Sequence, residues 1–417
     1  MSAKGPMMTA VPDDLPRGLE LTSLSPTFRA DPHAVLNAAR GKCPVLHDGV
    51  LRDYVVLSAE VGRKVLADRQ LPSDPRNTVE TSTRRLRGED LTRDPPIMFM
   101  DDPLHKRVRG LVGRAFNAER IERARPRVAA LCHQLIDAAG ANGGGFDFID
   151  AIARPLPTIT IADILGIDSR HHDDFKVWSD RMVAAMLNPL APPAVKEEGA
   201  AAAVSLYQLF SAEIALRRAG PMDGDDLITA LMTVEHQGER LSDPEIVEHA
   251  QVLLIAGNQT TTDLLGTTLC NILRTGDSWA RLVADPGLIP NAVDEAIRFE
   301  PPIFSTDRIA AEDMELGGVA IPRGHQISVM LTALNHDPAV NPDPDRFDIA
   351  RKPVKHFSFG GGRHTCLGAP LARLEAQELL KAMVARVPTL VADPAHEAVY
   401  TMNPGFRGLD SFWVKPA

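Results

Sequence analysis

The sequence predicts a mainly α-helical fold with a minor β part. Residues 100–300 form an almost unbroken series of segments with apolar side chains at helical spacing. By contrast, residues 1–70 and 305–417 contain short β-branched runs between turns, which makes them partly β-rich. The chain shows no internal repeat and no low-complexity tail. We therefore expect residues 1–417 to form a single domain.

Strand-like and helical segments follow one another along the first half of the chain. The run "YVVLS" at residues 54–58 predicts an early strand. Helices are expected at 101–116, 125–141, 146–166, 170–187 and 197–220. The proline-rich break "NPLAPPA" separates the last two and predicts an exposed loop.

The longest predicted helix begins at Ser242. Ser242 and Glu245 have the spacing of a capping box, and Pro244 falls in the first turn, where proline is favoured. The helical pattern continues to about Arg274, which corresponds to roughly 50 Å. Because the segment is apolar on nearly every side, we expect it to be buried.

The middle of this helix contains residues that helices do not favour. The stretch "LLIAGNQTTTDLL", residues 253–265, places a glycine and three threonines inside an apolar run. Glycine and threonine both lower helix stability. A gap beside neutral hydrogen-bonding groups in a buried helix therefore needs a functional explanation.

The pattern changes beyond residue 290. A helix is expected at 290–299, and a β-hairpin within 313–331. A long irregular stretch at 335–362 then leads to a strong helix at 367–387.

Composition excludes several classes of protein. The formal charge of −10 disfavours nucleic-acid binding. The N-terminus lacks the apolar core of a signal peptide, and no run approaches the roughly 20 apolar residues of a membrane span. We expect a cytoplasmic protein with no membrane contact. Cys43, Cys132 and Cys270 match no zinc pattern and are expected to be small buried side chains.

The fourth cysteine lies in the most informative stretch, "HFSFGGGRHTCLGAPLARLEAQ". Cys366 stands between a glycine-rich turn and a helix, and a helix N-terminus favours a thiolate, the ligand that a soft or redox metal requires. The glycines at 360–362 allow the backbone to approach a flat ligand closely. Three other interpretations remain: a phosphate-binding loop, a nucleophilic cysteine with His364 as its base, and an inert cysteine in a turn.

The pattern F-x-x-G-x-H-x-C-x-G resembles the haem-binding loop of the cytochromes P450, most closely the soluble bacterial class. Its members here are Phe359, Gly362, His364, Cys366 and Gly368. The resemblance implies haem b (iron protoporphyrin IX) between the long helix on its distal side and the cysteine loop on its proximal side. Cys366 would be the axial iron ligand, and Phe359 would shield its sulfur.

Other landmarks of the family follow in order over about residues 95–410. The resemblance implies that His105, Arg109, Arg308 and His364 meet the haem propionates. It also implies a structural ion-pair network of Glu295, Arg298 and Arg346, which would hold the cysteine loop. Gly368 completes the haem-binding motif.

On the distal side, "AGNQTT" resembles the family pattern A/G-G-x-D/E-T-T/S. The resemblance implies that Gly257 makes room for dioxygen and that Thr260 helps to deliver protons. Gln259 departs from the pattern, because an amide cannot readily take up and release a proton. Gln259 is either a spacer that orients water or the cause of slow proton delivery, and Asp263 either offers a substitute relay or is a surface or capping group.

The implied activity is that of a haem-thiolate monooxygenase, which inserts one oxygen atom into a small organic substrate by hydroxylation or O-dealkylation. Gln259 suggests a hydrogen-peroxide-driven peroxygenase as the alternative. A haem-based sensor and a haem-free binding module are less consistent with the intact motifs. The family's substrate segments point to an apolar pocket lined by Ile97, Met98, Leu253, Ala256, Ile303, Phe304 and Phe406.

We expect electrons to come from another protein, because no flavin or nicotinamide domain is recognisable in the sequence. The resemblance implies a ferredoxin and an NAD(P)H-dependent ferredoxin reductase, and we expect a monomer. Lys106, Arg107, Arg114 and Arg363 are expected to face an acidic partner. A second basic group is expected to form a charged, solvated face near the substrate entrance: Arg84, Arg85, Arg87 and Arg93.

Overall fold

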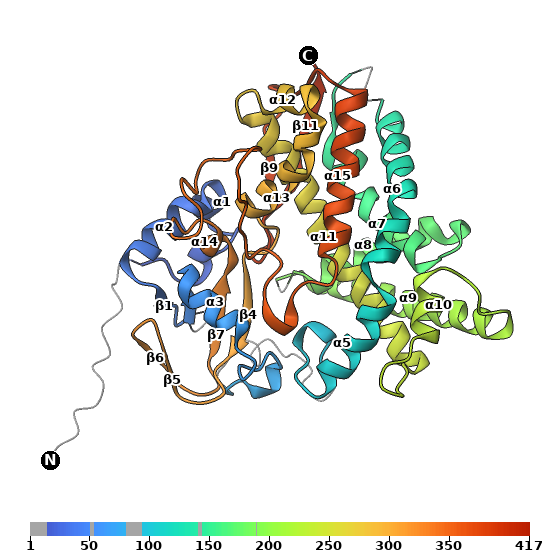
Figure 1. Ribbon diagram of the computed structural model, residues 1–417, viewed down its shortest axis with the longest axis horizontal. Coiled ribbons are helices and arrows are strands. Elements are labelled where there is room, and N and C mark those ends of the chain that lie inside the picture. The colour runs from blue at the N-terminus through green and yellow to red at the C-terminus, as the bar shows by residue number, and fades with distance from the viewer. Residues whose placement is uncertain (1–14, 51–53, 81–93, 141–143, 189) are drawn as a thin grey trace.

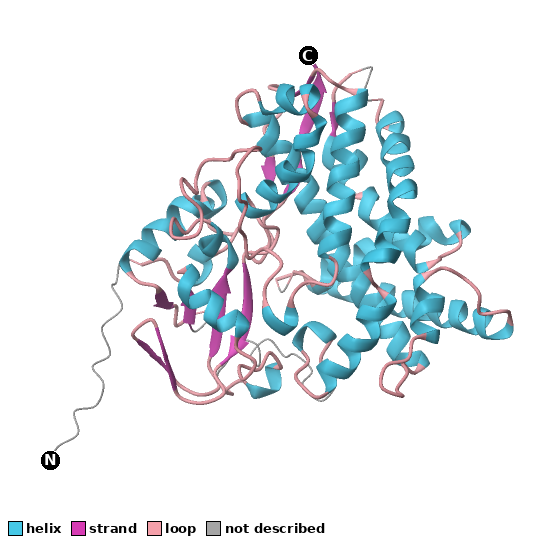
Figure 2. Cartoon of the chain, viewed as in Figure 1, coloured by secondary structure: helices cyan, strands magenta, loops and turns pink. Residues whose placement is uncertain are grey.

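The largest sheet and most of the long helices occupy different parts of the molecule. The computed structural model describes residues 15–50, 54–80, 94–140, 144–188 and 190–417. Most of the long helices gather on one side of the view, and the first helices with strands β1 to β7 other than β3 gather on the other, while β9 and β11 lie among the helices (Figures 1 and 2). The predicted mainly α fold with a minor β part is confirmed.

The longest helix, α11, spans Asp243–Arg274 and passes through the helical region (Figure 1). Glu245 accepts a hydrogen bond from the backbone N–H of Ser242 at 2.7 Å, so the predicted capping box is present. Every residue from 261 to 270 is buried. The prediction of a long buried helix is therefore confirmed, and α11 provides a rigid platform at the centre of the fold.

The other helices of this region pack around α11. They are α5 Leu104–Ala115, α6 Ala118–Ala138, α7 Pro155–Leu165, α8 His172–Met186, α9 Pro193–Ala219, α10 Leu227–Thr233, α12 Ser278–Ala284, α13 Ile289–Phe299 and α15 Ala369–Arg386. Helices α7, α9, α13 and α15 contact α11 directly. Against the sheets lie α1 Pro26–Ala30, α2 Pro32–Lys42, α3 Ala59–Ala67 and α14 Leu331–Asn335.

Two helix predictions need correction. Helix α6 begins at Ala118 rather than near 125, because Asn117 caps it by accepting from the N–H of Arg120 at 2.9 Å. The expected helix at 146–166 is divided into strand β3 Phe146–Asp147, a π-helical turn Ile149–Ala153 and α7. Asp147 pairs with Trp413 across a sheet, so this part of the chain forms a strand instead of the expected helix.

Helix α9 is long and apolar enough, by length and composition, to cross a membrane. The expectation that no such run exists is therefore wrong on composition. In the fold, α9 packs against α8 and α11, and a Cβ at Gly199 would lie only 2.1 Å from the Cβ of Ala185. Its Glu213 is buried and forms an ion pair with Arg217. These contacts make α9 part of the helical core.

The largest sheet joins segments that are distant in sequence, in the order β1-β2-β7-β4. These strands are β1 Val45–His47, β2 Tyr54–Val56, β4 Ser305–Ile309 and β7 Gln326–Met330. Strands β2 and β7 run parallel, and the other neighbours are antiparallel. Strand β2 confirms the strand predicted from "YVVLS".

Smaller sheets complete the β part. Strands β5 Met314–Leu316 and β6 Val319–Ile321 pair antiparallel, which confirms the predicted hairpin. The C-terminal strands are β8 Leu390–Ala392, β9 Val399–Tyr400, β10 Leu409–Ser411 and β11 Trp413–Pro416. Strand β11 lies between β3 and β8, and β9 pairs with β10. The C-terminal segment therefore lies against the helical region close to α11.

Candidate active site

A tight glycine-rich loop carries Cys366 to the start of α15. The backbone N–H of Cys366 donates to the carbonyl of Phe359 at 2.9 Å, which closes the loop. Gly362 has φ +66°, and a Cβ there would lie 2.2 Å from the carbonyl oxygen of Leu66. Only glycine fits this position without a clash. The loop is thus held against α3, with Cys366 at a fixed place.

The sulfur of Cys366 is subject to opposing influences. By surface area Cys366 is exposed, whereas Cys132 and Cys270 are buried as expected and Cys43 is half-buried. Protein atoms nevertheless surround the sulfur closely enough to raise its pKa, while hydrogen bonds from the backbone of Gly368 and Ala369 and the charge of Arg109 lower it. Burial is the largest of these influences, so the pKa of the Cys366 thiol lies above its ordinary value and the loop donors oppose this only in part.

Helix α11 presents an open face among buried residues. Ala256 is exposed and Thr260 is half-buried, although the helix around them is largely buried. A Cβ at Gly257 would meet nothing within 4 Å. The Thr260 hydroxyl donates to the carbonyl of Ala256 at 2.7 Å. This segment has the space and the polar group that the sequence predicts for it.

Gln259 has a partner within the same helix. Its Nε2 donates to Oδ1 of Asp263 at 2.8 Å. Asp263 is only 1% exposed. Of the two roles considered for Asp263, that of a surface group is therefore wrong.

Basic side chains from three elements form a cluster near the cysteine loop. His105 of α5 and His364 lie with ring centroids 4.4 Å apart, and Nε2 of each is buried without a partner among the described residues. Burial, and after it the charges of His105 and the surrounding arginines, lowers the pKa of His364 to about 3. The pKa of Arg308, on β4, is also lowered by burial and by Arg363. The buried Arg308 guanidinium, beside imidazole nitrogens that lack a partner, fits an anionic ligand.

Arg109 completes this cluster by donating to the carbonyl of Thr365 in the cysteine loop. The four residues predicted to meet an anionic ligand are therefore brought together from α5, β4 and the loop. Arg363 joins them and forms an ion pair with Asp101 at 2.9 Å through its Nη2.

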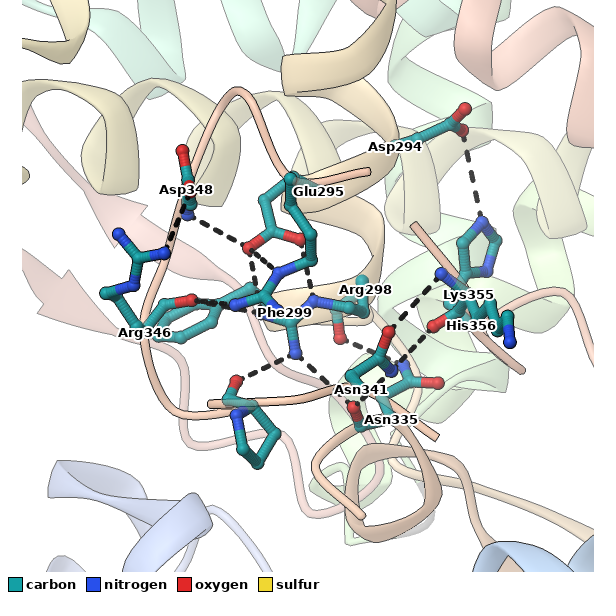
Figure 3. Close-up of polar contacts among 12 residues, drawn as sticks. Asp294, Glu295, Arg298, Phe299, Asn335, Asn341, Arg346, Asp348, Lys355 and His356 are labelled. Carbon is teal, nitrogen blue, oxygen red and sulfur yellow. Dashed lines mark hydrogen bonds and ion pairs between the residues drawn. The ribbon is translucent and has the colours of Figure 1, made fainter. Parts of the chain in front are cut away.

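Glu295 and Arg298 of α13 form a fully buried ion pair (Figure 3). Arg298 Nε and Nη2 donate to the two carboxylate oxygens of Glu295 at 2.7 and 2.9 Å. Glu295 also accepts from the backbone N–H of Asp348 at 3.0 Å. Arg298 donates to the carbonyls of Asn335 and Pro344 as well. The pair therefore ties α13 to the irregular segment before the cysteine loop.

The prediction that the Arg346 side chain completes this network is wrong. That side chain is 63% exposed and pairs with Asp343 and Asp348, and only its carbonyl accepts from Arg298. Arg351 takes the predicted place, because its Nε donates to Glu295 Oε1 at 3.0 Å and it is 9% exposed. The sequence held no signal that separated these two arginines of one irregular segment.

Arg107 was expected to face a partner protein. Its guanidinium instead forms ion pairs with Glu239 and Glu245, so it ties α5 to the start of α11. Lys106 and Arg114 are exposed. The residues Arg84, Arg85, Arg87 and Arg93 lie outside the described part of the chain.

The residues predicted to contact substrate do not all share one surface. Ile303 and Phe406 are bridge partners, and Ile303 is 37% exposed. Phe304 points the other way: it is 1% exposed, its ring lies 5.0 Å from that of Phe28, and it belongs to a separate apolar core. The prediction for Phe304 is therefore wrong, since neighbouring side chains of an extended segment alternate in direction.

The remaining substrate candidates have mixed environments. Ile97 and Met98 lie on a 3₁₀ turn, Ile97–Phe99, with Ile97 buried and Met98 40% exposed. On α11, Leu253 is half-buried and Ala256 is exposed.

Comparison with known proteins gives a consistent result. Residues 286–391 match the Cytochrome P450 family model. The chain is 35% identical to cytochrome P450 monooxygenase PikC of Streptomyces venezuelae over 410 residues, which cover 96% of this chain and 94% of that protein. It is 34% identical to 6-deoxyerythronolide B hydroxylase of Saccharopolyspora erythraea, over 98% of this chain and 99% of that protein. Among solved structures, CYP109B1 of Bacillus subtilis, described as a versatile cytochrome P450 enzyme, matches with a TM-score of 0.81 and 32% identity, over 92% of this chain and 99% of that one.

Proposed function

Since the chain belongs to the cytochrome P450 family and is one of its monooxygenases, we propose that it inserts one atom of dioxygen into a small organic substrate by hydroxylation or O-dealkylation. The observation that carries this proposal is the position of Cys366, which a closed glycine-rich loop holds just before α15.

The residues present fit haem b as the cofactor. Cys366 would provide the thiolate ligand of the iron, and His105, Arg109, Arg308 and His364 would donate to the two propionates. The unpaired Nε2 atoms of the two histidines support this assignment, because a buried donor without a partner is costly. Haem held in this way supplies the redox iron that activates dioxygen.

The protein's own part in the reaction lies on α11. Gly257 leaves room beside the helix, and Thr260 carries the hydroxyl that can pass a proton along a hydrogen-bonded path. Phe359 would limit the access of water to the sulfur, which helps to set the redox potential of a thiolate-bound metal. Arg373 lies 4.6 Å from the centre of the Phe359 ring and holds that ring in place.

Electrons would come from a ferredoxin and its NAD(P)H-dependent reductase, in a cytoplasmic, monomeric enzyme. Exposed Lys106 and Arg114, both on α5, would attract an acidic partner. The net charge of −10 argues against nucleic acid as a ligand.

The names of the relatives suggest a substrate class. One relative is a hydroxylase of 6-deoxyerythronolide B, another is a steroid C26-monooxygenase of Mycobacterium tuberculosis, and one structure of CYP109E1 from Bacillus megaterium holds testosterone. We therefore place steroids and macrolactones beside aromatic, terpenoid and fatty-acid compounds in the set to be tested.

A peroxygenase is the second candidate, and Gln259 is the residue that favours it. Hydrogen peroxide brings its own protons, so a weak proton path would matter less. Thr260 with an ordered water is the simpler interpretation of the same residues.

The test compares two ways of driving the reaction. Product formation is measured with ferredoxin, reductase and NADH, and in parallel with hydrogen peroxide, for the wild-type enzyme and for Cys366→Ala and Thr260→Ala. We expect electron-driven turnover to dominate in the wild type, Thr260→Ala to divert electrons to hydrogen peroxide, and Cys366→Ala to lose oxygenation. Cys43→Ala is the matched control and should retain activity.

Two results would contradict the proposal. Retained oxygenation in Cys366→Ala would exclude the axial assignment, and unchanged coupling in Thr260→Ala would remove that residue from the proton path. A wild-type enzyme that works better with peroxide would be a peroxygenase.

A further inference from the structure

A buried carboxyl lies one helical turn beyond Gln259. Asp263 is 1% exposed, although aspartate is rarely buried without a charged partner. Its Oδ1 accepts from Gln259 Nε2 at 2.8 Å, and its Oδ2 is buried without a hydrogen-bond partner among the described residues. A half-satisfied buried carboxyl is costly, so its presence in the middle of α11 calls for an explanation.

The fold provides space for this carboxyl and little charge to balance it. A Cβ at Gly408 would lie 1.8 Å from Asp263 Oδ1, so the carboxyl occupies the place that any side chain at 408 would need. Arg154, the cation that acts on Asp263, pairs with Asp150. Asp410 is exposed on β10 and adds a negative charge. Burial raises the pKa of Asp263 well above its usual range, and the bond from Gln259 only partly opposes this.

The bond to Asp263 decides which end of the Gln259 amide remains available. An amide has one donor end and one acceptor end. With Nε2 held by Asp263, the carbonyl Oε1 is free, and no described residue donates to it. Thr260 is the next residue in the chain, and its hydroxyl is bound to the carbonyl of Ala256. The acceptor end of Gln259 is thus the free end of the side chain that directly precedes Thr260 in α11.

We propose that Asp263 is the positioning residue for Gln259: it fixes the amide so that Oε1 is the hydrogen-bond acceptor offered next to Thr260. This inference rests on the proposed function and deepens it. An acceptor at this place orients a water molecule, which donates one hydrogen to Gln259 Oε1 and keeps the other for the path through Thr260. The amide itself transfers no proton, so an amide can stand where relatives of this enzyme class use an acid.

The pairing also predicts how an acid at position 259 would behave. Gln259→Glu alone would bring two buried carboxyls to within hydrogen-bonding distance, where they cannot both ionise. The single variant should therefore impair the enzyme. The double variant Gln259→Glu with Asp263→Asn restores an acid–amide pair in the reversed order and should recover much of the loss.

The first experiment distinguishes a positioning role of Asp263 from a role in which its carboxyl takes up and releases a proton. Enzyme labelled with ¹⁵N-glutamine, as the diamagnetic ferrous carbonyl complex, gives the side-chain amide signal of Gln259, identified by its loss in Gln259→Glu. Asp263→Ala should shift this signal and lower product formed per NADH by roughly fivefold to tenfold, with little change in KM. Asp263→Asn should keep the Gln259 amide signal and the product formed per NADH close to wild type, since the asparagine oxygen accepts the same hydrogen bond. Asp277→Ala, a carboxyl removed just beyond α11, is the control.

Several outcomes would overturn the inference. An unmoved Gln259 signal in Asp263→Ala would show that the carboxyl does not hold the amide. Equal loss of coupling in Asp263→Asn and Asp263→Ala would assign proton chemistry to Asp263 instead. Improved coupling in Gln259→Glu alone, with no further gain in the double variant, would show that the two positions act independently.

Failure of the proposed function would look different. A wild-type protein that formed no product under either set of conditions would contradict the monooxygenase proposal. The Gln259 signal would still report whether Asp263 holds the amide.

Discussion

At the scale of single residues, the site is defined by two arginines and two histidines, and burial lowers the pKa of both histidines. His105, His364, Arg308 and Arg109 are buried or half-buried near one another. Such a group is unfavourable by itself and becomes favourable when carboxylates bind to it. The same residues should therefore affect the protein in opposite ways with and without its cofactor.

Arg308→Gln tests this reversal. The variant should lose haem roughly tenfold to a hundredfold faster than the wild type, because one charged hydrogen bond to a propionate is removed. Without haem, the variant should be at least as stable as the wild type, since a buried positive charge is lost. Haem transfer to an excess of apomyoglobin gives the rate of haem loss. Urea unfolding of the haem-free protein gives its free energy of unfolding.

Arg346→Gln is the matched control, because its guanidinium is exposed and pairs only with nearby aspartates. This substitution should change neither the rate of haem loss nor the stability of the haem-free protein. An Arg308→Gln protein that holds haem as firmly as the wild type would remove Arg308 from the cofactor site.

Residue-level predictions succeeded where a short motif fixes the neighbours. The spacing of Phe359, Gly362 and Cys366 lies within one loop, and the structure closes that loop as the motif requires. Arg346 and Phe304 were misplaced for a different reason. The direction of their side chains depends on strands and helices far away in sequence, and no local pattern encodes it.

At the scale of elements, α13 and the irregular segment 335–362 hold each other through Glu295. Four groups donate to this carboxylate, three of them from arginines and one from the backbone N–H of Asp348. Removing the negative charge would leave Arg298 buried at 0% exposure without its counter-ion. The element that carries the cysteine loop would then lose its anchor.

Glu295→Gln should lower the free energy of unfolding by about 3–5 kcal/mol, the cost of breaking a buried ion pair on one side. Arg346→Ala should change it by less than about 0.5 kcal/mol. Urea unfolding of the two variants and the wild type measures these changes in the free energy of unfolding. Equal, small effects of the two substitutions would mean that the buried pair does not secure the segment.

Gly257 creates a conflict between helix stability and function. Glycine in a helix costs about 1 kcal/mol relative to alanine, and here an added Cβ would meet nothing. Gly257→Ala should therefore raise the unfolding free energy by up to about 1 kcal/mol while lowering electron-driven product formation, because the methyl group enters the open face of α11. Thermal unfolding and product per NADH are the two measurements.

The control for Gly257 is Gly276→Ala, which lies just beyond α11 at φ +50° and should destabilise the protein. A Gly257→Ala enzyme with full activity would show that the space beside this glycine is not used.

Element bounds were predictable where caps are local. The capping box at Ser242 fixed the start of α11, whereas the start of α6 was missed because Asn117 caps it ahead of a first turn rich in charged side chains. The segment 146–166 was misread as one helix because the strand pairing of Asp147 with Trp413 joins distant parts of the chain. Long-range pairing of this kind leaves little trace in a single sequence.

At the scale of the whole molecule, the parallel pairing of β2 with β7 brings the first strands to the second half of the chain. The sheet region and the helical region are thereby joined across most of the sequence. Such an assembly buries ionisable side chains that are in contact with water in the unfolded chain. Glu375 of α15 is an example, because it is only 2% exposed. Its burial links the stability of the fold to pH.

Burial raises the pKa of Glu375 to about 8 from an ordinary value of 4.5. Between these values the folded protein keeps a proton that the unfolded chain has released, so a rise in pH favours unfolding. The contribution of this group to stability is complete below pH 4.5 and is lost as pH approaches 8. Glu375→Gln, an uncharged near-isostere, should therefore gain stability relative to wild type as pH rises, by a few kcal/mol at pH 8.

Urea unfolding at pH 5, 6, 7 and 8 measures this difference, with exposed Glu397→Gln as the control that should follow the wild type at every pH. A Glu375→Gln curve parallel to that of the wild type would mean that the carboxyl ionises in the folded protein. A fixed loss of stability at all pH values would mean that its packing, and not its proton, is what the fold uses. Only a difference that grows with pH fits a carboxyl kept neutral by the helices around it.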